Sequence, residues 1–257
     1  AMEQRSDFEK LIRERRVDYH FQPIVSAHDG HVVAYEALMR PQLPTLRSPL
    51  TVMQLASEMG RLYDIEKLTF FRACECYEEL EAAGKLDADA LIFVNSIASV
   101  SLSNEDWASY CEAHSAILPK LVVEITEEEE MNERELERKR NVPGSSGVFA
   151  LDDYGSGYSN GNSLLTIAPK YVKVDIAIIR GIDTDADKQQ FLMTLIDYAH
   201  PRGVQVLAEG VETLSELRKV LEMGVDLLQG YCLARPAAVP PPLSKEAADI
   251  IHRMKRC

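Results

Sequence analysis

The chain has 257 residues, with 28 Lys and Arg against 41 Asp and Glu, so its formal net charge is −13. This excess of acid excludes a protein that grips nucleic-acid backbones by charge, and we expect neither a DNA nor an RNA duplex as a partner. The composition, 46% hydrophobic and 27% charged, is that of a globular protein, and the length suits a single (β/α)8 barrel.

Membrane and export signals are not expected in this chain. No stretch approaches the ~20 apolar residues that span a bilayer, and the start, residues 1–16, is too charged for a secretory signal. The cysteines are odd in number and scattered, which favours reduced thiols. They are Cys74, Cys76, Cys111, Cys232 and Cys257. We therefore expect a cytoplasmic domain that makes no membrane contact.

Short apolar runs rich in β-forming residues recur along the chain and predict eight strands. In chain order they are residues 19–25, 32–38, 91–94, 121–125, 148–151, 171–174, 204–208 and 226–228. Stretches with helical character lie between them, at 69–83, 128–140, 188–199, 214–223 and 245–254. Hydrophobic strands that alternate with helices indicate a parallel sheet covered on its faces, and about eight of them suggest closure into a barrel.

Local signals support this division into elements. Thr126 with Glu129 and Thr213 with Glu216 fit the T-x-x-E capping box, which predicts a helix start just after a strand. The proline-rich segment PAAVPPP, residues 236–242, predicts a loop that leads into the last helix.

Polar residues interrupt the hydrophobic runs at or near the carboxyl ends of seven strands. They are Glu36, Asn95, Glu124, Asp152, Asp153, Lys173, Glu209 and Gln229. In a β/α barrel these strand ends converge on one face, where the active site is built, so we expect all eight side chains to line one pocket.

Each of these residues also has a structural explanation when taken alone. Asn95 or Asp153 could cap a helix, Glu124 could pair with Lys173 in a buried ion pair, and Gln229 could satisfy a loop. Eight such residues at seven strand ends are hard to attribute to capping, and together they favour a functional site.

Five of the eight are carboxylates, which would repel one another unless protons or cations neutralised them. Since the candidate ligands are oxygens, without His or Cys, the set favours Mg²⁺ or Mn²⁺ over Zn²⁺ or copper. Asp152 could bridge two ions while Asp153 serves one. Such a pair of ions can activate water and stabilise the leaving oxygen of an in-line phosphoryl displacement.

Two other chemistries are weaker interpretations of the same residues. Gly155-x-Gly157 lacks the G-x-G-x-x-G spacing and follows two acids that would repel a pyrophosphate, so we read it as a hinge in the aspartate loop. Lys173 could form a Schiff base, but five nearby acids would raise its pKa and keep it cationic.

The residues singled out above stand in a series of short segments. In chain order the segments are FQPIVSAHDGHVVAYEALMR, FVNS, VVEITE, ALDDYGSGYS, YVKVD, LAEGVET and LLQGY. This series resembles, over roughly residues 5–240, the motifs of the EAL-domain cyclic di-GMP phosphodiesterases. The resemblance implies one domain over residues 1–257, a TIM-like barrel with one antiparallel strand, followed by a C-terminal helix at about 243–256. It also implies hydrolysis of cyclic di-GMP to linear 5′-pGpG with two Mg²⁺ or Mn²⁺, inhibition by Ca²⁺, a homodimer, and possible fusion to sensory or cyclase domains in bacterial signalling.

The resemblance also implies roles for individual residues. Ligands of the first metal would be Glu36, Asn95, Glu124 and Asp152, and Asp152 with Asp153 would hold the second. The general base would be Glu209, the water-orienting cation Lys173, and the substrate contacts Arg40 and Gln22. Support of the aspartate loop and pocket falls to Glu127, Glu212 and Gln229.

Two departures from the family pattern stand out. Pro41 occupies a position that is commonly aromatic, and NGNSLLTIAP is more polar than usual and one residue longer. Because no implied ligand is missing, the sequence favours an active enzyme. The alternative is a catalytically silent cyclic di-GMP receptor or protein-interaction module.

Overall fold

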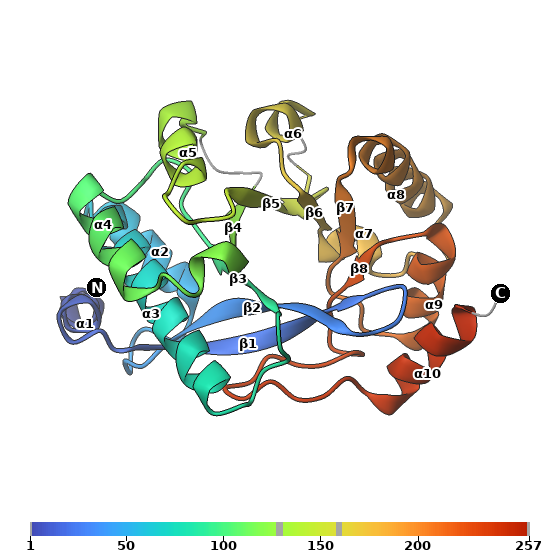
Figure 1. Cartoon of the computed structure of the whole chain (residues 1–257), viewed down its shortest axis with the longest axis horizontal. Coiled ribbons are helices and arrows are strands. Elements are labelled where there is room, and N and C mark those ends of the chain that lie inside the picture. The colour runs from blue at the N-terminus through green and yellow to red at the C-terminus, as the bar shows by residue number, and fades with distance from the viewer. Residues whose placement is uncertain (1, 127–130, 158–160, 256–257) are drawn as a thin grey trace.

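The computed structural model describes residues 2–126, 131–157 and 161–255, and its strands close into one barrel in the order β1 to β8 (Figure 1). The strands are β1 Val17–Ser26, β2 Val32–Pro41, β3 Leu91–Asn95, β4 Leu121–Thr126, β5 Val148–Tyr154, β6 Tyr171–Val174, β7 Gln205–Ala208 and β8 Leu227–Leu228. All eight predicted strands are present, and the predicted TIM-like barrel is confirmed.

One strand runs against the others. β1 pairs with both β2 and β8 in antiparallel fashion, while every neighbouring pair from β2 to β8 is parallel. The single antiparallel strand implied by the resemblance is therefore β1. Its register places Gln22 opposite Glu36.

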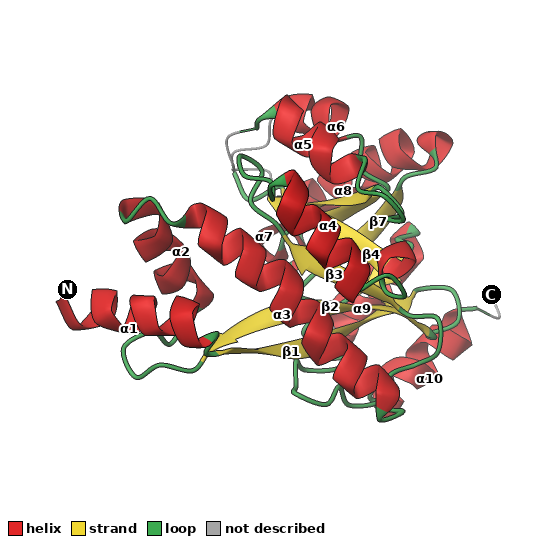
Figure 2. Ribbon diagram, turned by 60° about the vertical axis from the view of Figure 1, so that its left-hand side comes forward, coloured by secondary structure: helices red, strands yellow, loops and turns green. Residues whose placement is uncertain are grey.

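The hairpin of β1 and β2 extends beyond the end of the parallel pairing in the barrel. Parallel pairing of β2 with β3 ends at Ala37, whereas pairing with β1 continues to Pro41. Figure 2 shows α1 and α2 beside this extension. The far end of β2 is therefore a wall outside the closed ring of strands.

Helices cover the outside of the barrel. They are α1 Met2–Glu14, α2 Pro49–Glu58, α3 Leu62–Ala82, α4 Asn104–Ala113, α5 Glu133–Arg140, α6 Gly161–Ile167, α7 Ile176–Ile179, α8 Ala186–Ala199, α9 Leu214–Met223 and α10 Lys245–Met254, with 3₁₀ turns η1 Leu118–Lys120 and η2 His200–Arg202. Among the described residues, no helix combines the length and apolar character needed to cross a membrane.

The two predicted capping boxes are described to different extents. The capping box of Thr213 and Glu216 is confirmed at the start of α9, with both hydrogen bonds formed. The helix expected over residues 128–140 is found as α5 over Glu133–Arg140, and residues 131 and 132 before it are not helical. Asn132 caps α5, since its side chain accepts the Glu135 N–H, and Thr126 is the last residue of β4. The expected start at residue 128 lies outside the described residues, as does Glu129.

The inside of the barrel is filled by one apolar residue from each strand. This layer consists of Ile24, Ala34, Phe93, Val122, Ala150, Tyr171, Leu207 and Leu227. All eight are at most 3% exposed. We call this layer the apolar floor, because it lies directly beneath the side chains at the carboxyl ends of the strands.

Gly230 should be irreplaceable because two backbone segments meet there. A Cβ at this position would lie 2.2 Å from the carbonyl oxygen and 2.3 Å from the nitrogen of Val211. We expect Gly230→Ala to lower the free energy of unfolding by about 2 to 4 kcal/mol, measured by denaturant unfolding. Gly161→Ala is the control, since that site is open and begins α6, and it should change stability by less than about 0.5 kcal/mol. Equal effects of the two substitutions would contradict this account.

Candidate active site

The polar residues found in the sequence form a second layer directly above the apolar floor. Side chains of a strand alternate between its two faces, so the residue two positions along a strand points the same way. The second layer consists of Gln22, Glu36, Asn95, Glu124, Asp152, Lys173, Glu209 and Gln229. Each stands two positions from the floor residue of its strand, and in the reversed strand β1 this step runs backwards, from Ile24 to Gln22.

Lys173 lies among three carboxyl groups of this layer and is completely buried. Its ammonium nitrogen is 3.1 Å from Glu36 Oε2, 2.9 Å from Glu124 Oε1 and 3.2 Å from Asp152 Oδ1. Burial alone would lower the pKa of Lys173, but the charges of Asp152, Glu124 and Glu209 raise it well above its ordinary value. Lys173 is therefore a fixed cation, and the ion pair with Glu124 weighed from the sequence is present.

The buried acids differ in their affinity for protons. Burial would raise the pKa of Glu36, but Lys173 and a 2.6 Å hydrogen bond donated by Gln229 hold it below its ordinary value. Burial and the nearby charge of Glu36 raise the pKa of Glu124 well above its ordinary value. Burial likewise raises the pKa of Glu209, with Asp152 adding to the shift. The single positive charge of Lys173 thus cannot neutralise all of these carboxyl groups.

The side chain of Asp153 joins the site because β5 is irregular at this position. Alternation would turn it away from its neighbour Asp152, but the register of β5 shifts between Leu151 and Tyr154, and Asp153 has a φ of 55°. Its backbone N–H donates to Asp152 Oδ1 at 3.0 Å. Burial, together with the charge of Asp152, raises the pKa of Asp153 to about 7.

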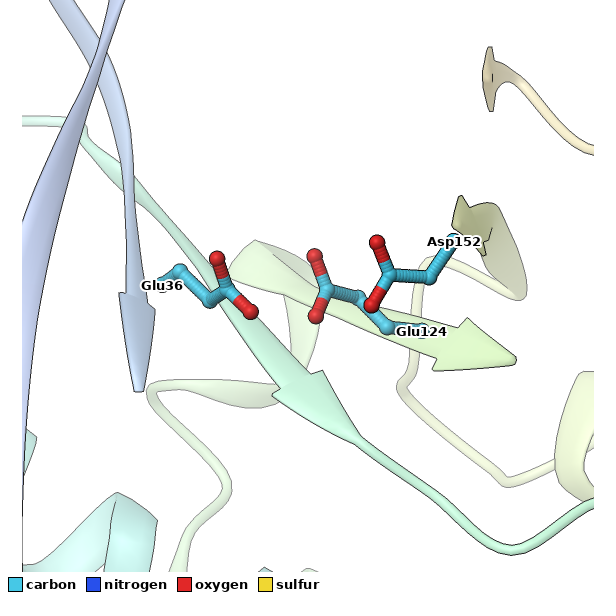
Figure 3. A group of neighbouring side chains, drawn as sticks. All are labelled: Glu36, Glu124 and Asp152. Atoms are coloured by element: carbon cyan, nitrogen blue, oxygen red, sulfur yellow. The ribbon is translucent and has the colours of Figure 1, made fainter. Parts of the chain in front are cut away.

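The acids form two groups that share one residue. Ligand oxygens of Glu36, Glu124 and Asp152 lie within 4.8 Å of one another, and so do those of Asp152, Asp153 and Glu209. Figure 3 shows the carboxyl groups of the first group converging from three strands. Within the described part of the chain, Glu124 Oε2 and Glu209 Oε2 are buried and accept no hydrogen bond, and Glu124 Oε1 has only the ion pair with Lys173. Buried carboxylate oxygens without donors fit hard divalent cations.

Asn95 and the two glutamines border the first group. Asn95 Nδ2 donates to Glu36 Oε1 at 3.4 Å, although the Asn95 side chain is exposed. Gln229 Nε2 also donates to Gln22 Oε1 at 3.0 Å, and Gln22 in turn donates to the carbonyl oxygen of Ala234. These bonds tie β1, β2 and β8 together around Glu36.

A cavity of about 390 Å³ opens beside the acids. Asn95, Asp152, Asp153 and Arg40 all line it. Apolar side chains such as Leu50 and Met53 of α2 line the remainder. An anionic group with an apolar body would fit this combination of charge and surface.

Of the three residues expected to support the aspartate loop and the pocket, only Gln229 contacts Glu36 among the described residues. Glu127 lies outside the described residues. Glu212 forms an ion pair with Arg180 at 2.8 Å, and its N–H donates to Glu216.

Sequence analysis also missed Glu66 and Lys139, two buried charged residues close to the turn that follows Asn95. The spacing of Lys139, three residues after the buried Leu136, was the available signal.

The sequence matches the EAL domain family over residues 5–236, and the chain belongs to that family. It is 29% identical over 244 residues to the cyclic di-GMP phosphodiesterase NbdA of Pseudomonas aeruginosa, in an alignment that covers 91% of this chain and 31% of NbdA. The chain thus spans about a third of the length of this curated relative.

Solved structures of similar fold include relatives crystallised with ligands. The PaMucR phosphodiesterase in complex with c-di-GMP has a TM-score of 0.77 and 25% identity, with 91% of this chain and 96% of that one covered. The manganese and c-di-GMP complex of BlrP1 from Klebsiella pneumoniae has a TM-score of 0.73 and 25% identity, with 86% of this chain and 56% of that one covered.

The raised pKa values predict a stability that falls as the pH rises in chelator-treated protein. Asp153 holds its proton up to about pH 7 in the folded chain, against an ordinary pKa of 3.8, so the folded state binds more protons than the unfolded state in this window. Glu124 and Glu209 act in the same direction. We expect the free energy of unfolding to decrease by about 2 kcal/mol or more between about pH 5 and pH 8, measured by urea unfolding.

Asp153→Asn is the matched variant for this test, because Asn tolerates the left-handed backbone. It should reduce the pH dependence by removing one of the titrating groups. Lys173 stays charged throughout this range and contributes no slope. An unchanged slope in Asp153→Asn would contradict the assignment.

Proposed function

We propose that the chain is a metal-dependent phosphodiesterase that hydrolyses cyclic di-GMP to linear 5′-pGpG. The observation that carries the proposal is the sharing of Asp152 between two groups of carboxylates around a fixed cation, beside a cavity that contains Arg40. Membership of the EAL domain family and the names of the relatives support the choice of substrate.

Two divalent cations, Mg²⁺ or Mn²⁺, suit this donor set. Glu36, Asn95, Glu124 and Asp152 would hold one, and Asp152 with Asp153 would hold the other. When bound, such ions neutralise the acids, activate water and stabilise charge on a phosphoryl oxygen. Manganese in the BlrP1 complex is consistent with this assignment. Inhibition by Ca²⁺ belongs to the same proposal, since Ca²⁺ takes more ligands at longer distances.

The chain's own residues supply binding and proton transfer. Arg40 lines the cavity and would pair with a phosphate of the substrate. Gln22, which would also contact the substrate, accepts a hydrogen bond from Gln229 beside Glu36. Glu209 has a buried oxygen without a hydrogen-bond donor, and its raised pKa applies to the metal-free site. With cations bound, their charge would favour the ionised carboxylate, which could then accept a proton from the attacking water. Lys173 keeps three carboxyl groups together and would orient that water.

The proposal extends to assembly. An expected homodimer needs an exposed apolar surface, and a groove of about 580 Å³ lies between α6 and α8, where Leu164, Leu165 and Phe191 line it. Because the chain spans about a third of NbdA, fusion to sensory or cyclase domains remains part of the same proposal.

Incubation of the purified chain with cyclic di-GMP and Mn²⁺ should convert the substrate to 5′-pGpG, measured by chromatography. Asp152→Ala should abolish this conversion, since it removes a ligand from both groups at once. Undiminished cyclic di-GMP despite tight binding would contradict the proposal and indicate the silent receptor.

Glu209→Gln should lower kcat by about 100-fold or more while leaving KM within about threefold, because it removes a proton acceptor and keeps the shape of the side chain. Steady-state kinetics at saturating Mn²⁺ measure both constants. Glu222→Gln, at an exposed position of α9, is the control and should behave as the wild type. A wild-type kcat in Glu209→Gln would refute the role of Glu209.

A further inference from the structure

A buried ion pair lies against the turn after β3, outside the two carboxylate groups. Glu66 of α3 is 1% exposed and Lys139 of α5 is 2% exposed. Lys139 Nζ is 3.4 Å from Glu66 Oε1. Charged residues are rarely buried to this degree unless they are paired and bonded, so the contacts of both side chains matter.

Both side chains bind the turn that directly follows Asn95, at Ser96 and Ile97. Glu66 accepts hydrogen bonds from the Ser96 hydroxyl and from the Ile97 N–H, the latter at 2.9 Å. Lys139 donates to the carbonyl oxygen of Ile97. The Ser96 N–H donates in turn to the Glu124 carbonyl oxygen at 2.9 Å. Two helices and β4 therefore fix the backbone of this turn.

Asn95 depends on that backbone because its own contacts are weak. Its side chain is exposed, and the hydrogen bond from Nδ2 to Glu36 Oε1 is long, at 3.4 Å. No packed wall selects one rotamer of an exposed side chain. The direction in which Asn95 presents its amide oxygen is thus set by the turn, and through the turn by Glu66 and Lys139.

Stability alone does not account for this pair. Apolar residues of similar size usually stabilise a protein as well as a buried ion pair does, or better. What Glu66 and Lys139 provide, and two leucines could not, is a set of hydrogen bonds to the turn.

We propose that Glu66 and Lys139 are positioning residues that hold Asn95 toward Glu36, Glu124 and Asp152, and thereby raise the affinity of that group for a divalent cation. This inference rests on the proposed function, which requires the cation. It adds two residues, from α3 and α5, to the apparatus that determines metal affinity.

The double variant Glu66→Leu with Lys139→Leu tests this proposal. We expect it to fold with a Tm below that of the wild type, because the buried Ser96 hydroxyl and Ile97 backbone lose their partners. It should bind Mn²⁺ about tenfold more weakly or worse, measured by electron paramagnetic resonance of free Mn²⁺. At saturating Mn²⁺ its kcat should approach the wild-type value. Glu78→Gln is the control: Glu78 lies on the same helix but pairs with His114, and Mn²⁺ affinity should not change.

Mn²⁺ affinity within twofold of the wild type in the folded double variant would overturn the proposal. If that variant does not fold, Lys139→Met keeps the length of the side chain and removes the donor to Ile97. It should then weaken Mn²⁺ binding and speed amide exchange at Ile97, and no change in either would overturn the proposal. A wild-type chain that binds Mn²⁺ but leaves cyclic di-GMP intact would refute the proposed function and not this inference.

Discussion

Repulsion among acids at the mouth of a closed barrel is the interaction on which the rest of the structure depends. Lys173 is the one buried cation in contact with Glu36, Glu124 and Asp152 among the described residues, and it cannot neutralise them all. Burial first, and repulsion by neighbouring carboxylates second, raise the pKa values of Glu124, Glu209 and Asp153. A site of this kind is destabilising by itself, and binding of cations would release that energy.

The apolar floor makes such a site tolerable. Eight buried side chains, one from each strand, lie beneath the polar layer and hold the strands in register. Since both layers follow from the alternation of side chains along each strand, the same geometry that packs the core also aims the acids at one another. Fold and site therefore have a common origin here.

Much of this arrangement was predictable from local patterns, and the exceptions have physical reasons. Their position at the carboxyl ends of predicted strands placed Glu36 and Lys173 in one pocket although 137 positions separate them. The family resemblance implied one antiparallel strand without saying which, because an apolar run carries no information on strand direction, and the structure identifies it as β1. Placement of Asp153 depends on a bulge that two consecutive aspartates do not reveal. Lys139 was overlooked because charged residues in a helix are usually solvated.

The overhang of the β1 and β2 hairpin makes the entrance to the barrel asymmetric. Met39 and Arg40 lie on this overhang, beyond the last parallel contact with β3, and line the cavity together with residues of α2. The recess that selects a ligand is thus built from parts that the closed ring of strands does not need. Evolution could reshape that recess through the open end of the hairpin and α2, and so change what the domain recognises, while the acids and their floor stayed as they are.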